Sequence, residues 1–276
     1  MQPIITYLSR RLFVNTIIYY FTGTGNSLKI SRDISKGIPN SRLRHIAAAL
    51  AEGSGTTVVS EKVGIVFPVY VEGLPLIVER FARSLNINGD TYVFAVANYG
   101  ESAGGSLLQL EDICAEKGSR LSSAFGLKMP DNTQILFPPS PVEEQRRDFD
   151  REAAAADDIA RTVSQGSEAG LNLIQRIQRT PRSPWKRPAF DPGKMAENFS
   201  ADEKCDGCAV CEEICPVRNI VMEGATPRWQ NRCEQCLACM QWCPQQAIQF
   251  SKRTSEWGRY HHPDVSVTEL LRRSCK

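Results

Sequence analysis

The 276-residue sequence contains no run of about 20 apolar residues, the length that a membrane-spanning helix requires. It also lacks an excess of one charge, because its formal net charge is +2, and such an excess favours nucleic acid or an anionic membrane as a partner. We therefore expect no membrane span and no nucleic-acid partner. A hydrophobic content of 42% is ordinary for a globular chain, and the length suffices for about two domains.

The apolar segment Leu12–Phe21 allows two interpretations. Arg10 and Arg11 before it would suit the start of a signal peptide. However, Asn15 and Thr16 interrupt its apolar character, and a glycine-rich loop follows it directly. A buried first strand explains these features better, so we expect no secretory leader.

Eight of the ten cysteines form one pattern that occurs twice with a constant offset. The first copy comprises Cys205, Cys208, Cys211, Cys215 and Pro216, and the second comprises Cys233, Cys236, Cys239, Cys243 and Pro244. Each copy reads C-x2-C-x2-C-x3-C-P, the run that holds iron–sulfur clusters in bacterial ferredoxins. The pattern therefore predicts two 4Fe-4S clusters, held by two copies of one supersecondary unit.

Two other uses of these cysteines fit the spacing less well. A zinc site takes its ligands as two separated pairs, which leaves the third cysteine of each copy without a role. Disulfides would suit a small secreted domain, whereas this chain is long. Cys114 and Cys275 lie outside the pattern, and we interpret Cys114 as a buried structural thiol on a helix. Free thiols beside cluster ligands require a reducing compartment, so we predict a cytoplasmic protein.

The first half of the chain alternates apolar, β-branched runs with helix-like segments, which is typical of an α/β fold with a parallel sheet covered on both faces. The predicted strands are Phe13–Phe21, Arg42–Ile46, Val63–Val69, Thr91–Ala97 and Phe125–Met129. The predicted helices are Ser27–Gly37, Leu74–Leu85, Ser106–Lys117 and a long stretch Val142–Arg179, broken or bent near Gly166 and Gly170.

Composition also predicts where the domains end. Four prolines between residues 180 and 200 indicate an extended linker. We therefore predict a first domain at residues 12–179, a proline-rich linker at 180–200, a cluster domain at 201–254 and a C-terminal tail at 255–276.

The first strand leads into the loop Thr22-Gly23-Thr24-Gly25-Asn26-Ser27, which precedes a helix. Backbone N–H groups and hydroxyls at such a helix N-terminus favour an anion. The loop lacks the G-K-[ST] ending of a P-loop and is not G-x-G-x-x-G, so neither a nucleoside triphosphate nor a dinucleotide is the natural ligand. A single phosphate monoester fits it, and the alternative is a helix-capping turn without a ligand.

Two further loops leave the same edge of the predicted sheet. The third strand is followed by Pro68, Val69 and Tyr70, and the fourth by Asn98, Tyr99 and Gly100. An aromatic ring can pack beside a flat heterocycle, so we expect Tyr99 to contact a cofactor. For Tyr70, a cofactor contact and an ordinary amphipathic surface position are equally consistent with the sequence.

The segment Tyr20–Ser27, together with Phe67–Tyr70 and Asn98–Gly100, resembles flavodoxin-like FMN domains. Nearly all of the chain, from about Phe13 to His262, looks like the fused flavodoxin–ferredoxin proteins of bacteria and archaea. The resemblance implies a doubly wound parallel five-stranded sheet in the order 2-1-3-4-5, joined to a small α+β ferredoxin domain. It also implies FMN at the carboxyl ends of the strands, with its phosphate on Thr22–Ser27 and its isoalloxazine ring between the loops at Pro68–Tyr70 and Asn98–Gly100.

In two-cluster ferredoxins the fourth cysteine of each run ligates the other cluster. The resemblance therefore implies one cluster on Cys205, Cys208, Cys211 and Cys243, which we name the first set. It implies the other on Cys233, Cys236, Cys239 and Cys215, which we name the second set.

Flavin and clusters in one chain favour an electron-transfer protein that relays single electrons between the clusters, FMN and external redox proteins. The alternative is an FMN-dependent reductase of a small substrate, with the clusters as its electron input. That enzyme would need an acid or base near the ring, and Glu72 and Glu101 lie in the relevant loops, although solvated surface positions explain them better. We expect no histidine near this site, and the sequence indicates no oligomeric state. A sensor is disfavoured because no DNA-binding motif is present.

Overall fold

The computed structural model describes residues 15–53, 60–171 and 191–271. Its centre is a parallel sheet formed by β1 (Thr16–Tyr20), β2 (Ser41–His45), β3 (Lys62–Pro68), β4 (Tyr92–Tyr99) and β5 (Leu121–Lys128). The strand order is β2-β1-β3-β4-β5 and all four pairings are parallel. This is the doubly wound, flavodoxin-like arrangement, so the predicted fold class is confirmed.

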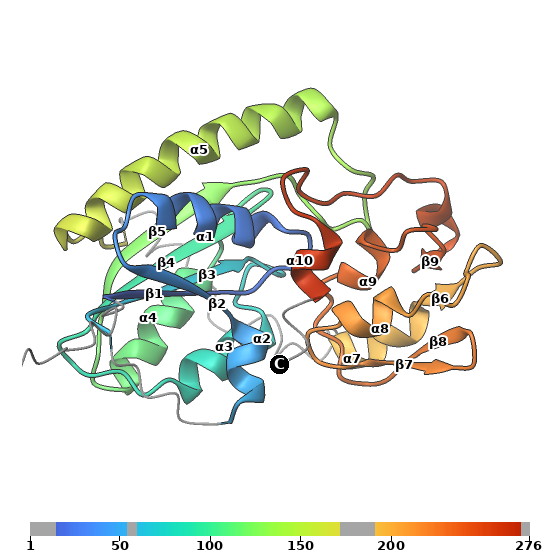
Figure 1. Ribbon diagram of the computed structural model, residues 1–276, viewed down its shortest axis with the longest axis horizontal. Helices are drawn as coiled ribbons and strands as arrows, with labels where there is room; N and C mark the ends of the chain where they lie inside the picture. Colours follow the sequence, from blue (N-terminus) through green and yellow to red (C-terminus); the bar gives the residue numbers. More distant parts are fainter. Residues whose placement is uncertain (1–14, 54–59, 172–190, 272–276) are drawn as a thin grey trace, which may run out of the picture.

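Helices cover both faces of this sheet, as near-continuous apolar strands require. In Figure 1, α1 (Asn26–Lys36) and α5 (Val142–Gln165) lie on one face, and α3 (Leu76–Ser84) and α4 (Ser106–Glu116) lie on the other. The short helix α2 (Ile46–Ala51) was not predicted, and the Nδ1 atom of His45 caps it by accepting a hydrogen bond from the N–H of Ala47. Helix α5 ends at Gly166, whose φ of 66° stops it. The predicted helical stretch is wrong for residues 167–171, which are not helical, and Ala169 instead forms a bridge with Ser123 on β5. Residues 172–179 lie outside the described residues.

We name residues 191–271 the cysteine part, and residues 15–53 and 60–171 the sheet part. The two parts lie side by side (Figure 1). The main elements of the cysteine part follow the order β–α–β–β–α–β: β6 (Ser200–Ala201), α8 (Val210–Ile214), β7 (Ile220–Glu223), β8 (Thr226–Trp229), α9 (Ala238–Gln241) and β9 (Ile248–Gln249). Strand β6 pairs antiparallel with β9, and β7 with β8.

The predicted repeat is present in the backbone of the cysteine part. Helices α8 and α9 begin one residue before the third cysteine of their respective runs. Positive φ angles recur at equivalent positions of the two copies, at Gly207 and Gln235, at Ala209 and Leu237, and at Arg218 and Gln246. Left-handed residues other than glycine are uncommon, so this recurrence confirms two copies of one supersecondary unit.

The predicted linker is wrong for residues 191–200. They form α7 (Pro192–Met195), the 3-10 helix η2 (Ala196–Asn198) and the start of β6. Ala196 and Phe199 are buried in an apolar cluster with residues of the cysteine part, and Phe199 stacks on Trp229 with ring centroids 5.6 Å apart. The proline content of this stretch therefore reflects helix initiation at Pro192 rather than a linker. Residues 180–190 of the predicted linker lie outside the described residues.

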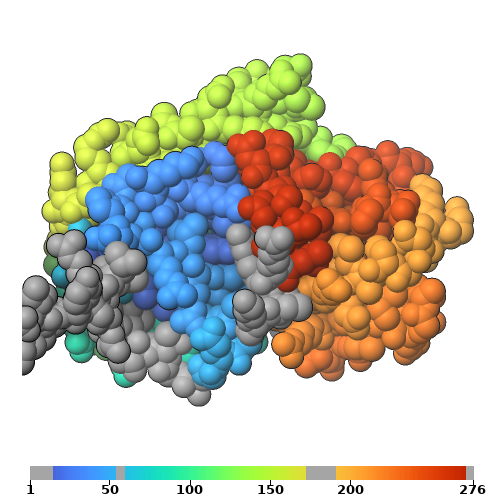
Figure 2. Space-filling view, in the orientation of Figure 1, coloured from blue at the N-terminus to red at the C-terminus, as the bar shows by residue number. Residues whose placement is uncertain are grey.

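The predicted C-terminal tail is also wrong for residues 255–271. After η3 (Lys252–Ser255), the chain crosses to the sheet part and ends in α10 (Val267–Leu271). Tyr260, His262, Val265 and Leu270 are buried, and Figure 2 shows this red segment directly against blue residues, in agreement with the ion pair between Glu269 on α10 and Arg32 on α1. Apolar residues of the cysteine part join the core of the sheet part. None of the helices within the described ranges is long and apolar enough to cross a membrane.

Candidate functional site

The loop Thr22–Ser27, here named the glycine loop, connects β1 to α1 at the carboxyl edge of the sheet. Every residue in it is buried. Gly25 adopts a φ of 98°, which a side chain would disfavour, and its N–H donates to Thr22 Oγ1 at 2.9 Å. The loop therefore turns sharply into the helix, as the sequence predicts.

The hydrogen bonds of the glycine loop involve its carbonyl groups and leave several of its backbone N–H groups without an acceptor in the described part of the chain. Its carbonyl groups face the cysteine part: Gly23 O accepts from Trp242 Nε1 at 2.8 Å, and Thr24 O accepts from the N–H of His262 at 2.8 Å. In contrast, several backbone N–H groups find no acceptor among the described residues, namely those of Gly23, Thr24, Asn26, Ser27 and Leu28. Buried N–H groups without partners are costly, and an anion at this helix N-terminus would satisfy them. The loop therefore fits a phosphate group.

A cavity of about 180 Å³ opens beside the glycine loop at the ends of β3, β4 and β5. This volume is below the roughly 300–1,000 Å³ of pockets that enclose a whole ligand, so it suits one ring system rather than an entire nucleotide. We name it the strand-end cavity. It is lined by Asn26, Pro68, Val69, Val71, Glu72, Asn98, Tyr99, Gly100, Glu101, Ser102, Met129, Pro130, Asp131, Asn132 and Thr133.

The structure thus brings five of the six predicted ring-contact residues to one cavity. Asn98 ties the loops together, because its Nδ2 donates to Ser27 Oγ at 2.8 Å and to Phe67 O at 2.9 Å. The turn after β3 contains Val71 and Glu72 at φ angles of 47° and 61°. A β-branched residue in this region is strained. Neither position with a positive φ is a glycine, and Gly73 closes the turn by pairing with Tyr70.

Tyr70 is the predicted ring-contact residue that does not line the cavity. Its side chain is buried and meets Phe21 edge-on, with centroids 6.2 Å apart. Its hydroxyl has no hydrogen-bond partner among the described residues. Burial, followed by the charges of Cys236 and Glu234, raises the pKa of Tyr70. The ring therefore separates the strand-end loops from the cysteine part and stays protonated.

The second cysteine set surrounds one space. Cys215, Cys233, Cys236 and Cys239 line a small cavity together with Trp229 and other apolar residues. Backbone N–H groups already point at two of these sulfurs, since Asn219 donates to Cys215 Sγ at 3.1 Å and Gln235 donates to Cys233 Sγ at 3.3 Å. Such N–H···S bonds are one way in which a protein tunes a cluster.

Three residues of the first cysteine set, Cys208, Cys211 and Cys243, lie near one another. Burial raises the pKa of Cys211 to about 12, and the nearby thiolates of Cys243 and Cys208 contribute to the rise. Ala247 N–H donates to Cys243 Sγ at 3.4 Å, which repeats the Asn219 contact at the equivalent position of the second copy. Among the residues that the structure describes, no three His, Cys, Asp or Glu side chains converge to hold a single metal ion. In a cubic 4Fe-4S cluster each cysteine binds a different iron. The absence of a single-ion site from the described residues therefore does not bear on a cluster, whose ligands do not converge on one ion.

The glycine loop and the second set are in direct contact. A methyl group placed on Gly23 would lie 2.1 Å from the carbonyl oxygen of Cys236, so only glycine permits this approach. Glu234, which lies between Cys233 and Cys236, accepts a hydrogen bond from the N–H of Ile77 at 2.9 Å and thereby caps the start of α3.

The segment 259–266, here named the C-terminal segment, covers the glycine loop from outside. Tyr260 Oη donates to Asn26 Oδ1 at 2.7 Å, and Val265 and His262 pack on Gly25. His262 therefore lies against the glycine loop, whereas none of the residues that line the strand-end cavity is a histidine. His261 stacks on Trp242 at 4.1 Å, and burial lowers the pKa of His262 to about 4, so its ring is neutral.

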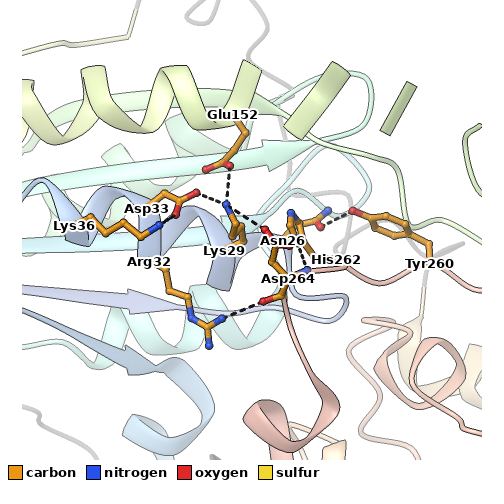
Figure 3. A network of polar contacts seen from close by, with 9 residues as sticks. All are labelled: Asn26, Lys29, Arg32, Asp33, Lys36, Glu152, Tyr260, His262 and Asp264. Atoms are coloured by element: carbon orange, nitrogen blue, oxygen red, sulfur yellow. Dashed lines mark hydrogen bonds and ion pairs between the residues drawn. The ribbon is translucent and has the colours of Figure 1, made fainter. Parts of the chain in front are cut away.

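Charged side chains of α1 and α5 surround this contact (Figure 3). Lys29 lies 3.9 Å from Glu152 and 3.7 Å from Asp264 and also pairs with Asp33. Glu152 is 1% exposed, and its carboxylate oxygens accept no hydrogen bond from the described residues. Burial, followed by the charge of Asp33, raises the pKa of Glu152 to about 7. The network fastens the C-terminal segment to α1.

Cys114 is the remaining predicted thiol within the described residues. It is 3% exposed on α4, and burial raises its pKa to about 11. The prediction of a buried structural thiol is confirmed. Cys275 lies outside the described residues.

No family model matches the sequence, and no curated protein matches it. Similar solved structures include a flavodoxin from Megasphaera elsdenii (17% identity, 51% of this chain, 98% of that chain, TM-score 0.33). A WrbA-like flavodoxin from Agrobacterium tumefaciens has 15% identity over 56% of this chain and 99% of its own, with a TM-score of 0.36. A rubredoxin oxygen:oxidoreductase from Desulfovibrio gigas has 16% identity over 55% of this chain, at a TM-score of 0.35, and this chain covers 36% of it. Likenesses of this size assign no family, and the fold class is established by the strand order.

Proposed function

We propose that this chain is an electron-transfer protein that binds FMN in residues 12–179 and two 4Fe-4S clusters in residues 201–254. One observation carries the proposal: the glycine loop, with its open N–H donors, lies against a group of four cysteines that line one cavity. A flavin exchanges one or two electrons and a cluster exchanges one, so their contact suits a relay. Its partners are redox proteins, and its free thiols suit the reducing cytoplasm.

The residues have separable tasks in this proposal. The N–H groups of the glycine loop hold the phosphate, and the strand-end cavity receives the ring. The crossed cysteine sets hold the clusters, and Trp229, Trp242 and their apolar neighbours exclude water from them. When bound, the flavin and the clusters supply the redox chemistry. No side chain is required to transfer a proton to a substrate.

A second candidate function follows from Glu72 and Glu101, which are exposed carboxylates that line the strand-end cavity. In an FMN-dependent reductase of a small molecule, either carboxylate would serve as an acid or base beside the ring. This function needs a substrate bound in the cavity above the ring, which the relay does not.

The test begins with the full chain reconstituted anaerobically with iron, sulfide and FMN. We expect one FMN and about eight irons per chain, as two cubic clusters require. Cys236→Ser should lose iron, while Cys114→Ser, which changes a buried cysteine outside the sets, should retain it. A chain that binds neither FMN nor iron would refute the proposal.

The same preparation distinguishes the two functions. Absorbance is followed after addition of NADH or NADPH alone, and then of a reduced ferredoxin. We expect the flavin to remain oxidised until the reduced ferredoxin is added. Rapid bleaching by a nicotinamide nucleotide alone would indicate a self-contained reductase.

A further inference from the structure

We propose that the two cysteine sets have different tasks: the second set passes electrons to and from the flavin through the contact of Cys236 with Gly23, and the first set exchanges electrons with external partners. This inference rests on the proposed function, because it assigns an order to the cofactors that the function requires. Sequence alone cannot assign the order, since the two cysteine runs are identical in spacing.

The second set lies at the boundary with the sheet part. The Cys236 carbonyl fills the space beside Gly23, and Trp242 donates its indole N–H to the carbonyl oxygen of Gly23 at 2.8 Å. Cys236 is 7% exposed and belongs to the apolar core that the two parts share. Glu234 fixes the loop of the second set to helix α3. These contacts hold the second set at a defined short distance from the glycine loop.

Tyr70 provides a second contact between the same two sites. Its hydroxyl would lie 3.2 Å from a methyl group on Gly23, and the carbonyl oxygen of Cys236 would lie 2.1 Å from the same methyl group. Tyr70 immediately follows Pro68 and Val69, which line the strand-end cavity. The space between the cavity and the second set is therefore filled by packed atoms rather than water.

The first set contains the most exposed cysteine of the two sets. Cys208 is exposed and Cys205 is half-buried, whereas no cysteine of the second set is exposed. The two sets meet where α8, which carries Cys211, packs against α9, which carries Cys239. The order along the molecule is therefore solvent, first set, second set, glycine loop.

The electron balance of this route is simple. A one-electron carrier protein of low potential gives one electron to the first cluster and is itself oxidised, and that electron moves to the second cluster and on to FMN. Two such transfers, with two protons from solvent, complete the reduction of FMN. The same order serves the reverse direction.

The route is tested by Gly23→Ala, with Gly170→Ala as the matched control. The added methyl group overlaps the Cys236 carbonyl at Gly23, whereas nothing lies within 4 Å at Gly170. After photoreduction of the clusters by a laser flash, absorbance follows their reoxidation and the flavin's reduction. The displaced carbonyl lengthens the path between the second set and the glycine loop, and we expect Gly23→Ala to slow this transfer severalfold. Transfer as fast as in Gly170→Ala would overturn the route.

The outer position of the first set is tested without the flavin. Bathophenanthroline disulfonate, an iron chelator, should remove iron in two phases of equal amplitude, because one cluster is accessible and the other is enclosed. Cys208→Ser should remove the fast phase. Release in a single phase, or a fast phase that survives Cys208→Ser, would overturn the assignment. If Cys208→Ser fails to fold, the two phases in the unaltered chain and the Gly23→Ala kinetics still decide it. A failure of the proposed function differs from each of these results, because the chain would then contain no iron or no FMN.

Discussion

The hydrogen bond between Tyr260 and Asn26 should control how tightly the glycine loop binds FMN. Both side chains are buried, at 2% and 5% exposure, and the Oη–Oδ1 distance is 2.7 Å. Asn26 is the first residue of α1, and it both contributes an open N–H and lines the strand-end cavity. Tyr260→Phe leaves the Asn26 oxygen buried without a donor, which costs about 1–3 kcal/mol.

If this cost destabilises the conformation of the glycine loop that binds FMN, the dissociation constant of FMN should rise by about 5- to 150-fold, because 1.4 kcal/mol corresponds to tenfold. Quenching of FMN fluorescence on titration into the apoprotein measures the constant. Tyr92→Phe is the matched control, since it removes a tyrosine hydroxyl that contacts Ser123 Oγ at 2.7 Å, far from the loop. Equal constants for the two variants would refute the reasoning that the C-terminal segment supports the loop.

Three further predictions concern single side chains. A carboxyl whose pKa is raised in the folded state stabilises the fold below its unfolded pKa, and this stabilisation is lost as the pH rises through the folded pKa. For Glu152 the loss occurs between about pH 4.5 and about pH 7. Glu152→Gln should therefore flatten the pH dependence of urea unfolding over that range and stabilise the chain by up to about 3 kcal/mol at about pH 8, whereas exposed Asp157→Asn should do neither. Cys114, whose pKa burial raises to about 11, should resist iodoacetamide at about pH 8 in the folded chain and react in urea, and labelling of the folded chain would contradict its burial. Glu234→Ala should destabilise the chain by about 1–2 kcal/mol through the lost cap on Ile77, whereas Glu234→Gln keeps an acceptor, and equal urea midpoints would exclude the cap.

Local patterns predicted most of the sheet part. Strands such as Lys62–Pro68 and Tyr92–Tyr99 are almost entirely apolar, so their burial on both faces follows from composition alone. The glycine loop and the cysteine runs are short motifs whose geometry is fixed by nearby residues. The repeat was predictable for the same reason, because each cysteine of the first run has a counterpart at one constant offset.

Long-range contacts account for what the sequence did not predict. The C-terminal segment carries Tyr260, His262 and Val265 at alternating or near-alternating positions, a weak apolar signal among prolines and histidines. Their burial depends on a surface of α1 near the other end of the chain, as the Tyr260–Asn26 separation of 234 residues shows. Asp191 caps the helix that begins at Pro192, but the burial of Ala196 and Phe199 after it depends on an apolar cluster formed by distant residues.

These long-range contacts predict that the two parts unfold together. Ile214, Cys236, Trp242, Val265 and Leu270 belong to the same apolar core as the sheet strands, so separation would expose apolar surface on both sides at about 25 cal/mol per Å². Three of the four tryptophans, Trp229, Trp242 and Trp257, lie in the cysteine part, and Trp185 lies outside the described residues. The long helices lie in the sheet part.

Tryptophan fluorescence therefore reports on the cysteine part and far-ultraviolet circular dichroism on the sheet part. In urea titrations of the full chain, we expect the two signals to share one midpoint. Tyr260→Phe should move both signals to lower urea together, because the bond that it removes joins the parts. Two separate midpoints in the unaltered chain would mean that the shared core does not couple the parts, and that the short contact of Gly23 with Cys236 is not held by the fold.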